Sequence, residues 1–189
     1  MSENAHFLLA TLCGLVLAAI IHIVVILRTP HFAENDAFSK LRNTLTEDRA
    51  VVISAPGADS AWLPHGDPAV VVAACAFDLS EGPSRISARV GTTFQSLSFH
   101  AQGGSVFFAV TDRAAVKGVL EVLVMTRRQL DEALAAESDE APSQEVRIVS
   151  PRRTGFVVVR VAAPFPSQRA QAEETARAVS CEIEGEETS

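Results

Sequence analysis

The chain has 189 residues, of which 48% are hydrophobic, and 16 Lys and Arg against 23 Asp and Glu give it a formal net charge of −7. This composition excludes a disordered chain, which lacks the apolar residues that a packed core needs. The acidic balance argues against a nucleic-acid binder, because such a protein needs a basic surface to neutralise phosphates.

The N-terminal segment accounts for much of the hydrophobic excess. After a short flank, residues 1–6, the run from Phe7 to Leu27 contains no Asp, Glu, Lys or Arg. A helix rises about 1.5 Å per residue, so this run can cross a hydrocarbon core of about 30 Å. The flanks lack the basic residues and the small-residue cleavage site of a secretory signal peptide. We therefore expect an uncleaved transmembrane helix over residues 7–28. A cleaved signal and a buried soluble helix are the alternatives.

The charge distribution around this helix leans against an exported domain. All 16 Lys and Arg lie at or beyond Arg28. The positive-inside rule places such a domain in the cytoplasm, although the rule weakens when a long domain follows a single helix.

One face of the expected helix carries a row of special residues. Ala10, Gly14, Ala18 and His22 recur every four positions. Small residues let a second helix approach closely, and His22 would supply a polar contact. The alternative is that alanines are simply common in such helices and that His22 bonds a backbone carbonyl or reaches the interface.

The remaining chain changes to a strand-like pattern. Residues 29–48 predict a juxtamembrane linker with a short helix whose stripe is Phe38, Leu41 and Leu45, and residues 49–183 predict the main domain. Short apolar or alternating runs separated by turn residues indicate an antiparallel β-sandwich or a partly open barrel. The expected strands cover residues 51–54, 69–79, 86–90, 93–100, 105–111, 118–125, 145–149 and 155–163.

Two helices interrupt these strands. Thr126 with Gln129 three residues later forms a capping-box signature that opens a short helix. A final amphipathic helix is expected from the spacing of Ala172, Ala176, Val179 and Ile183, followed by an acidic tail at residues 184–189. The predicted fold class is thus mainly β, or α+β: an antiparallel β-sandwich with a few short helices, preceded by one transmembrane helix.

The cysteines bear on the compartment. Cys13 lies in the membrane segment, which leaves Cys75 and Cys181 for the domain. A pair is what an oxidising compartment permits, and a bridge would tie the C-terminal helix to the sheet. The alternative is that both are ordinary small buried hydrophobes. Two thiols so far apart do not form a zinc motif, since metal ligands cluster.

No residue constellation identifies a reaction, a metal site or a cofactor. His100 shares a strand face with Ser98 and Ser96, which suits an exposed sheet surface as well as a ligand site. His65 belongs to the sequence PHGDP, which predicts a tight turn and could alternatively bind a metal or a polar ligand. Asp78 precedes another turn, and its carboxylate can accept hydrogen bonds from the backbone N–H groups of that turn.

The stretch from Ala69 to Arg113 resembles the central motif of a bacterial family named domain of unknown function 1254. An apolar strand ends in Asp78 and Leu79, and the Gly82-Pro83 turn leads into the next strand. The late TGFVVVR and a C-terminal helix ending in Cys are similar to short membrane-anchored members. Members with longer chains have Tyr-rich strands, whereas this chain contains no Tyr.

The resemblance implies a single-pass inner-membrane protein whose β-sandwich lies in the periplasm. It also implies a companion membrane protein that carries the domain numbered 1214. Two hypotheses follow. The first is a structural or interaction module that pairs with this companion. The second is a small-ligand-binding or hydrolytic domain with a pocket between the sheets, using His65, Asp78 or His100.

Overall fold

The structure is a computed structural model that describes residues 3–29, 37–45, 48–54, 66–136 and 145–184. Its contacts divide the chain into two units, residues 1–35 and residues 36–189. The short helix that we expected in the juxtamembrane segment therefore folds as part of the second unit.

The described part of the first unit forms the helix α1 (Glu3–Arg28). Within the span Asn4–Arg28, an 18-residue window has a mean hydropathy of 2.7, and none of that window is buried. Thr11 donates its hydroxyl to the Phe7 carbonyl at 2.9 Å, which satisfies a polar group on an apolar surface. The expectation of one N-terminal helix long and apolar enough to cross a membrane is confirmed.

The predicted docking face lies on this helix. Ala10, Gly14, Ala18 and His22 are all exposed, and helical spacing places them along one side. A Cβ on Gly14 would meet nothing within 4 Å. The face is thus open for a second helix, and its use for docking stays a prediction.

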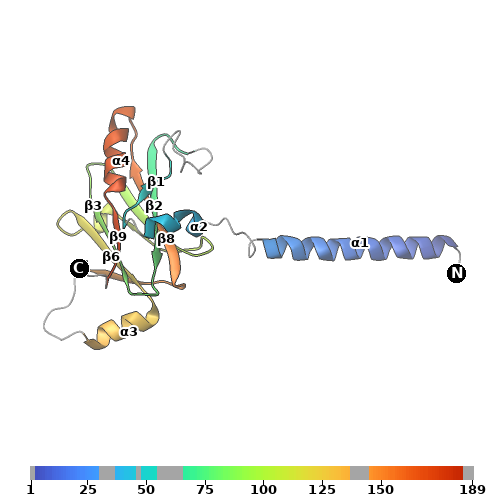
Figure 1. Cartoon of the computed structure of the whole chain (residues 1–189). Coiled ribbons are helices and arrows are strands. Elements are labelled where there is room, and N and C mark those ends of the chain that lie inside the picture. The colour runs from blue at the N-terminus through green and yellow to red at the C-terminus, as the bar shows by residue number, and fades with distance from the viewer. Residues whose placement is uncertain (1–2, 30–36, 46–47, 55–65, 137–144, 185–189) are drawn as a thin grey trace. The chain divides into compact units, whose positions relative to one another are not determined.

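The second unit is a β-sandwich (Figure 1). The first sheet has the order β1-β2-β8-β4-β5 and the second has the order β7-β6-β3-β9. The strands of the first sheet are β1 (Val51–Val52), β2 (Val70–Asp78), β4 (Gln95–Ala101), β5 (Val106–Thr111) and β8 (Thr154–Ala162). Those of the second are β3 (Ser84–Arg89), β6 (Val119–Met125), β7 (Val146–Val149) and β9 (Ser180–Ile183).

Within the described ranges, the strand pairs are antiparallel with one exception. β6 and β7 run parallel, and α3 (Arg127–Ala136) lies in the connection between them. Parallel neighbours need such a crossover, whereas antiparallel neighbours can be joined by a tight turn. The capping box that we predicted at the start of α3 is present, because Gln129 Oε1 accepts the Thr126 N–H at 2.8 Å. The mainly β sandwich is therefore confirmed, with a mixed second sheet.

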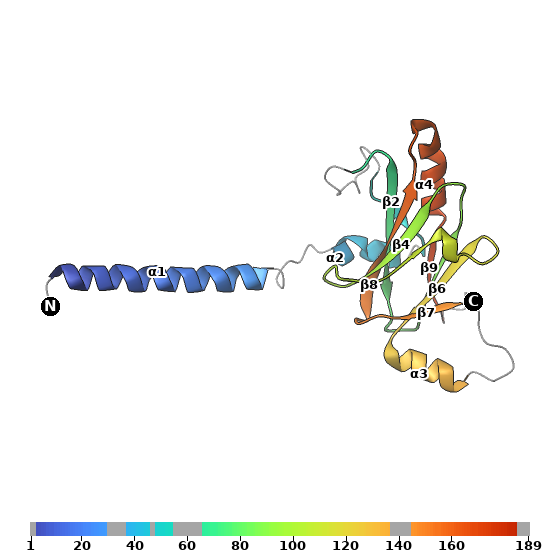
Figure 2. The ribbon, with the colours of Figure 1, turned by 180° about the vertical axis from the view of Figure 1, so that it is seen from behind.

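Helices cover both ends of the sandwich and one outer face. Figures 1 and 2 show α4 (Arg169–Arg177) and α3 at opposite ends of the two sheets. The outer faces of β2 and β8 are covered by α2 (Ala37–Leu41) and the 3-10 helix η2 (Arg42–Leu45). Two shorter 3-10 helices, η3 (Asp112–Ala114) and η4 (Pro166–Gln168), follow β5 and β8.

Strand β2 is buried on both faces, which explains its continuous apolar sequence. Inward-facing Cys75 and Phe77 belong to the main core, whereas outward-facing Ala74 and Ala76 belong to a second cluster with Phe38 of α2. A strand that is covered on both sides reads as an unbroken apolar run rather than an alternating one.

Thr44 joins η2 to this strand. Its buried hydroxyl donates to the Leu41 carbonyl at 2.6 Å and accepts the Ala76 N–H at 2.7 Å. β1 pairs only with Ala73 and Ala74 of β2, so its pairing does not reach Ala76. Thr44 thus completes the hydrogen bonding of the edge that β1 leaves open.

The substitution Thr44→Val is expected to lower the free energy of unfolding by about 1–3 kcal/mol, because it leaves the Ala76 N–H buried without a partner. Chemical denaturation would measure this loss. Thr44→Ser keeps the hydroxyl and should retain most of the stability. Equal losses for both variants would contradict the role of the hydrogen bond.

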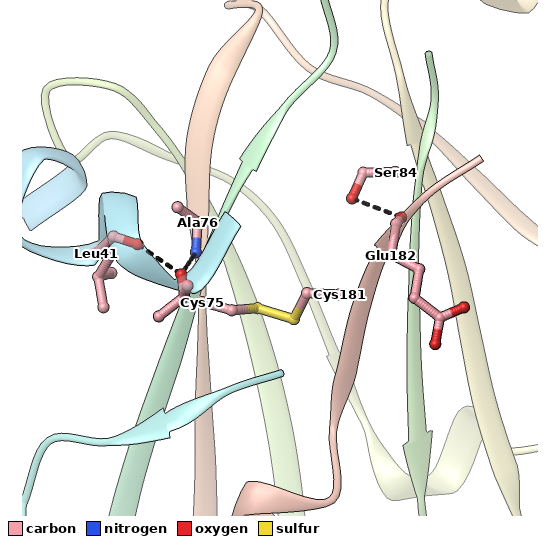
Figure 3. Close-up of a disulfide and its surroundings, with 7 residues drawn as sticks. Leu41, Cys75, Ala76, Ser84, Cys181 and Glu182 are labelled. Carbon is pink, nitrogen blue, oxygen red and sulfur yellow. Dashed lines mark hydrogen bonds between the residues drawn. A yellow bond between two sulfur atoms is a disulfide. The ribbon is translucent and has the colours of Figure 1, made fainter. Parts of the chain in front are cut away.

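A disulfide joins the two sheets. Cys75 of β2 bonds Cys181 of β9, with Cα atoms 6.6 Å apart and a sequence separation of 106. Figure 3 shows the bond crossing from one sheet to the other, beside the hydrogen bonds at Leu41 and Ala76. Of the two alternatives for this pair, the disulfide is the one that the structure contains.

The C-terminal prediction was wrong in one respect. The expected final helix extended through Val179 to Ile183, but α4 ends at Arg177 and β9 follows it. Ala172 and Ala176 do face the core from α4. Cys181 therefore lies in a strand, and the disulfide links sheet to sheet rather than helix to sheet. The reason is pairing with β3, in which Ile86 lies opposite Cys181.

Candidate functional site

The outer face of β4 carries the polar residues that the sequence singled out. Gln95, Leu97, Phe99 and Ala101 point inward and are buried. Ser96, Ser98 and His100 alternate with them on the outside and are half-buried. The period of two thus placed these three side chains correctly on one face.

Two of these residues are hydrogen-bonded to each other. Ser98 Oγ lies 3.0 Å from His100 Nε2, and His100 Nδ1 lies 3.1 Å from the Gly104 carbonyl oxygen. Because a carbonyl can only accept, Nδ1 carries the proton in the neutral ring. Nε2 is then the acceptor, and the Ser98 hydroxyl donates to it.

Strand β8 adds two further side chains to this face. The ring of Phe156 stacks on His100 with centroids 4.8 Å apart and an interplanar angle of 8°. Arg160 donates from Nη1 to Ser98 Oγ at 3.2 Å. The register pairs Phe156 with His100 and Val158 with Ser98, so β8 determines both contacts. We call Ser98, His100, Phe156 and Arg160 the outer-face cluster.

The outer-face cluster combines a cation, a hydroxyl and an oriented imidazole. The Ser98 hydroxyl and the His100 ring are hydrogen-bonded like a nucleophile and its general base, and the Gly104 carbonyl orients the ring. However, they lie on the face of a sheet, and neither of the two hollows described below is lined by them. The arrangement can hold a polar or anionic group by hydrogen bonds.

The other predicted ligand residues lie elsewhere. Asp78 Oδ1 accepts the Ser80 N–H at 3.0 Å, as expected of a turn residue, and β8 separates Asp78 from β4. In the register, Asp78 lies opposite Thr154 while His100 lies opposite Phe156. His65 is outside the described residues. The structure therefore does not bring Asp78 and His100 together in one pocket.

Two hollows can be described from the residues that the structure places. The first, of about 490 Å³, is lined by Ala114, Val116, Lys117, Val119, Glu121, Glu145 and Val146. The second, of about 430 Å³, is lined by Ser54, Gly66, Asp67, Pro68, Ala69, Ala163, Pro164, Pro166 and Arg169.

The single cation of the second hollow is held by the protein itself. Arg169 donates to the Pro68 and Ser54 carbonyls, each at 3.2 Å, and its Nε lies 3.3 Å from Glu173 Oε1. These bonds connect the first turn of α4 to both sides of the connection between β1 and β2. We therefore assign Arg169 a structural role rather than a role in ligand binding.

An ion-pair network on the second sheet was missed by the sequence analysis. Arg85 pairs with Glu145 at 2.8 Å and also with Glu184, while Arg147 Nε lies 3.4 Å from Glu145. The hydrogen bond with Glu184 raises the pKa of Arg85, an effect that partial burial opposes and Glu145 supports. While both glutamates are ionised, the raised pKa of Arg85 stabilises the fold, and this stabilisation is lost only as the pH rises into the strongly alkaline range, so the network does not act as a switch near neutrality.

Comparisons with known proteins add no function. No model of a known protein family matches the chain, and no curated protein matches its sequence. The crystal structure of the VPA0106 protein from Vibrio parahaemolyticus is 8% identical with a TM-score of 0.49, and the match covers 76% of this chain and 35% of that one. A putative uncharacterised protein from Burkholderia cenocepacia is 14% identical with a TM-score of 0.45, covering 68% and 34%. The chain thus spans about a third of each of these proteins, and we draw no argument from either.

Proposed function

We propose that the protein is a single-pass inner-membrane protein whose exported β-sandwich is an interaction module for a companion envelope protein. The observation that carries this proposal is the exposure of α1. The exposed fraction of its large apolar side chains ranges from 49% at Val24 to 75% at Phe7. No residue of Asn4–Arg28 is buried. Such a surface is stable only when a bilayer or another helix covers it.

The disulfide supports export of the domain. Cys75 and Cys181 are both buried and bonded, and such bonds persist in oxidising compartments such as the bacterial periplasm. We give this more weight than the positive charges that follow α1, because a long domain after a single helix translocates largely regardless of its charge.

The filled core favours an interaction module over an enzyme. Inward-facing side chains of both sheets, among them Phe77, Phe99, Ile86 and Leu120, are at most 1% exposed. The space between the sheets is occupied by these residues, so a ligand would have to bind at the surface. The outer-face cluster is such a surface, and it offers hydrogen bonds to a protein partner.

The resemblance to the domain of unknown function 1254 family suggests that this partner is a membrane protein carrying the 1214-type domain. Purification of the tagged full chain from detergent-solubilised membranes should recover a stoichiometric protein of different sequence. Gly14→Leu, which fills the open face of α1, should weaken this recovery if the helices dock, whereas Leu12→Ile leaves that face unchanged. Recovery of the tagged chain without a stoichiometric partner would contradict the proposal.

A further inference from the structure

Of the four sheet edges formed by the described residues, three are closed or charged. Beside β1, Ser54 Oγ accepts the Val72 N–H at 2.8 Å, as Thr44 does for Ala76. Beside β9, the Asp48 carbonyl accepts the Cys181 N–H at 2.8 Å. The edge strand β7 carries Arg147, which belongs to the ion-pair network. These are the ways in which proteins prevent an edge strand from pairing with another chain.

The fourth edge, β5, has neither a closing side chain nor a charge within the described part of the chain. It is the last strand in the order of its sheet, and its sequence, Val106–Thr111, contains neither a charge nor a proline. Val106 is 59% exposed, and Phe107, Phe108 and Val110 are only half-buried although they pack against the core. A bulge opposite Phe99 and His100 interrupts the first half of β5, so its regular part is residues 108–111.

The backbone of this regular part is oriented for pairing. On β4, the Ala101 N–H donates toward the β5 side, to Ser105, while the Gln102 N–H donates toward β8, to Thr154. Odd-numbered residues of β4 therefore bond to β5, and their partners there are Phe108 and Val110. The alternate residues Ala109 and Thr111 turn their N–H and C=O groups to the open side.

We infer that this edge pairs with the same edge of a second copy of the chain, joining two five-stranded sheets across a two-fold axis. Such an axis brings the residues around it close to their own copies, so a charge near the centre of the strand would lie close to an equal charge. The strand has no charge, in a domain that is otherwise acidic. With the axis at Val110, Val110 lies opposite its own copy and Ala109 lies opposite the partner's Thr111, so three residues of the regular part pair.

This inference goes beyond the proposed function, because it concerns a copy of the chain and needs no companion protein. The test therefore uses the purified full chain alone. Its mass in detergent micelles or nanodiscs is measured by sedimentation over a range of concentrations. Wild type should form a dimer. Ala109→Lys places like charges across the axis and should raise the dissociation constant by about tenfold or more.

Two controls separate this edge from other surfaces. Ala178→Lys adds the same charge at the exposed C-terminal cap of α4 and should leave the dimer intact. Gly14→Leu should also leave it intact, because the dimer contact is on the domain. A monomeric wild type, or a dimer that Ala109→Lys does not weaken, would overturn the inference.

Cross-linking in membranes identifies the occupant. In a Cys13→Ala background, Ala109→Cys with a short thiol cross-linker should give a species of twice the chain mass, whereas Gln171→Cys on the exposed side of α4 should not. Capture at position 109 of a protein of different sequence, with no doubled chain, would overturn the assignment to a second copy.

Discussion

Replacement of both Cys75 and Cys181 by alanine is expected to lower the free energy of unfolding of the domain by about 2–5 kcal/mol. The bond joins β2 of one sheet to β9 of the other and closes a loop with a sequence separation of 106. A loop of that size restricts the unfolded chain strongly, by about 4–5 kcal/mol in the chain-entropy model. Denaturant unfolding of the full chain in detergent, with and without reductant, measures the loss.

Cys13→Ala is the matched control for this variant. Cys13 is exposed on α1 and unbonded, so its removal should leave the stability of the domain unchanged. Reductant should destabilise wild type and Cys13→Ala by similar amounts and should have little effect on the double variant. Unchanged unfolding of the double variant would show that the core alone holds the two sheets together.

The same bond reports the compartment of the domain. In cells that export it, Cys75 and Cys181 should resist alkylation after denaturation until a reductant is added, because both sulfurs are bonded. In a domain that stays in the cytoplasm, both thiols should react before reduction. The second outcome would contradict the exported location within the proposed function.

Gly155→Ala is expected to destabilise the domain by about 1–3 kcal/mol through overpacking. A Cβ at this position would lie 2.3 Å from the His100 carbonyl oxygen and 2.4 Å from Cζ of Phe77. Phe77 and Gly155 lie opposite each other on β2 and β8, so the ring occupies the space that the missing side chain leaves. Since one obstacle is backbone, relief requires β4 and β8 to move apart.

Gly91→Ala is the control for this prediction. Its Cβ would meet Thr175 at 3.5 Å, an ordinary contact, and the substitution should be neutral or stabilising by up to about 1 kcal/mol. Thermal unfolding of the two variants measures the difference in sign. Because Gly155 contacts His100, chemical shifts of the His100 ring should also change in Gly155→Ala alone. Equal stability of the two variants would refute the close packing at Gly155.

Much of the candidate site could be read from the sequence, but not all of it. The alternation in β4 placed Ser98 and His100 on one face because a strand has a period of two. Phe156 and Arg160 come from β8, about sixty residues later, and the sequence holds no local signal for that register. The Arg85 network was missed for the same reason, since Glu145 and Glu184 reach Arg85 from distant segments.

The sequence by itself determined the features that depend on neighbouring residues. These are the long apolar helix, most strands and the capping box of Thr126, because hydrophobic period and turn chemistry act over a few residues. Tertiary structure decided the rest. After Ala176, the apolar spacing of Val179 and Ile183 suits a helix, yet pairing with β3 makes residues 180–183 a strand and carries Cys181 to Cys75. Long-range backbone pairing outweighed local helix propensity there. Pairing with β9 gives the backbone groups at the edge of β3 hydrogen-bond partners, and it also buries the disulfide.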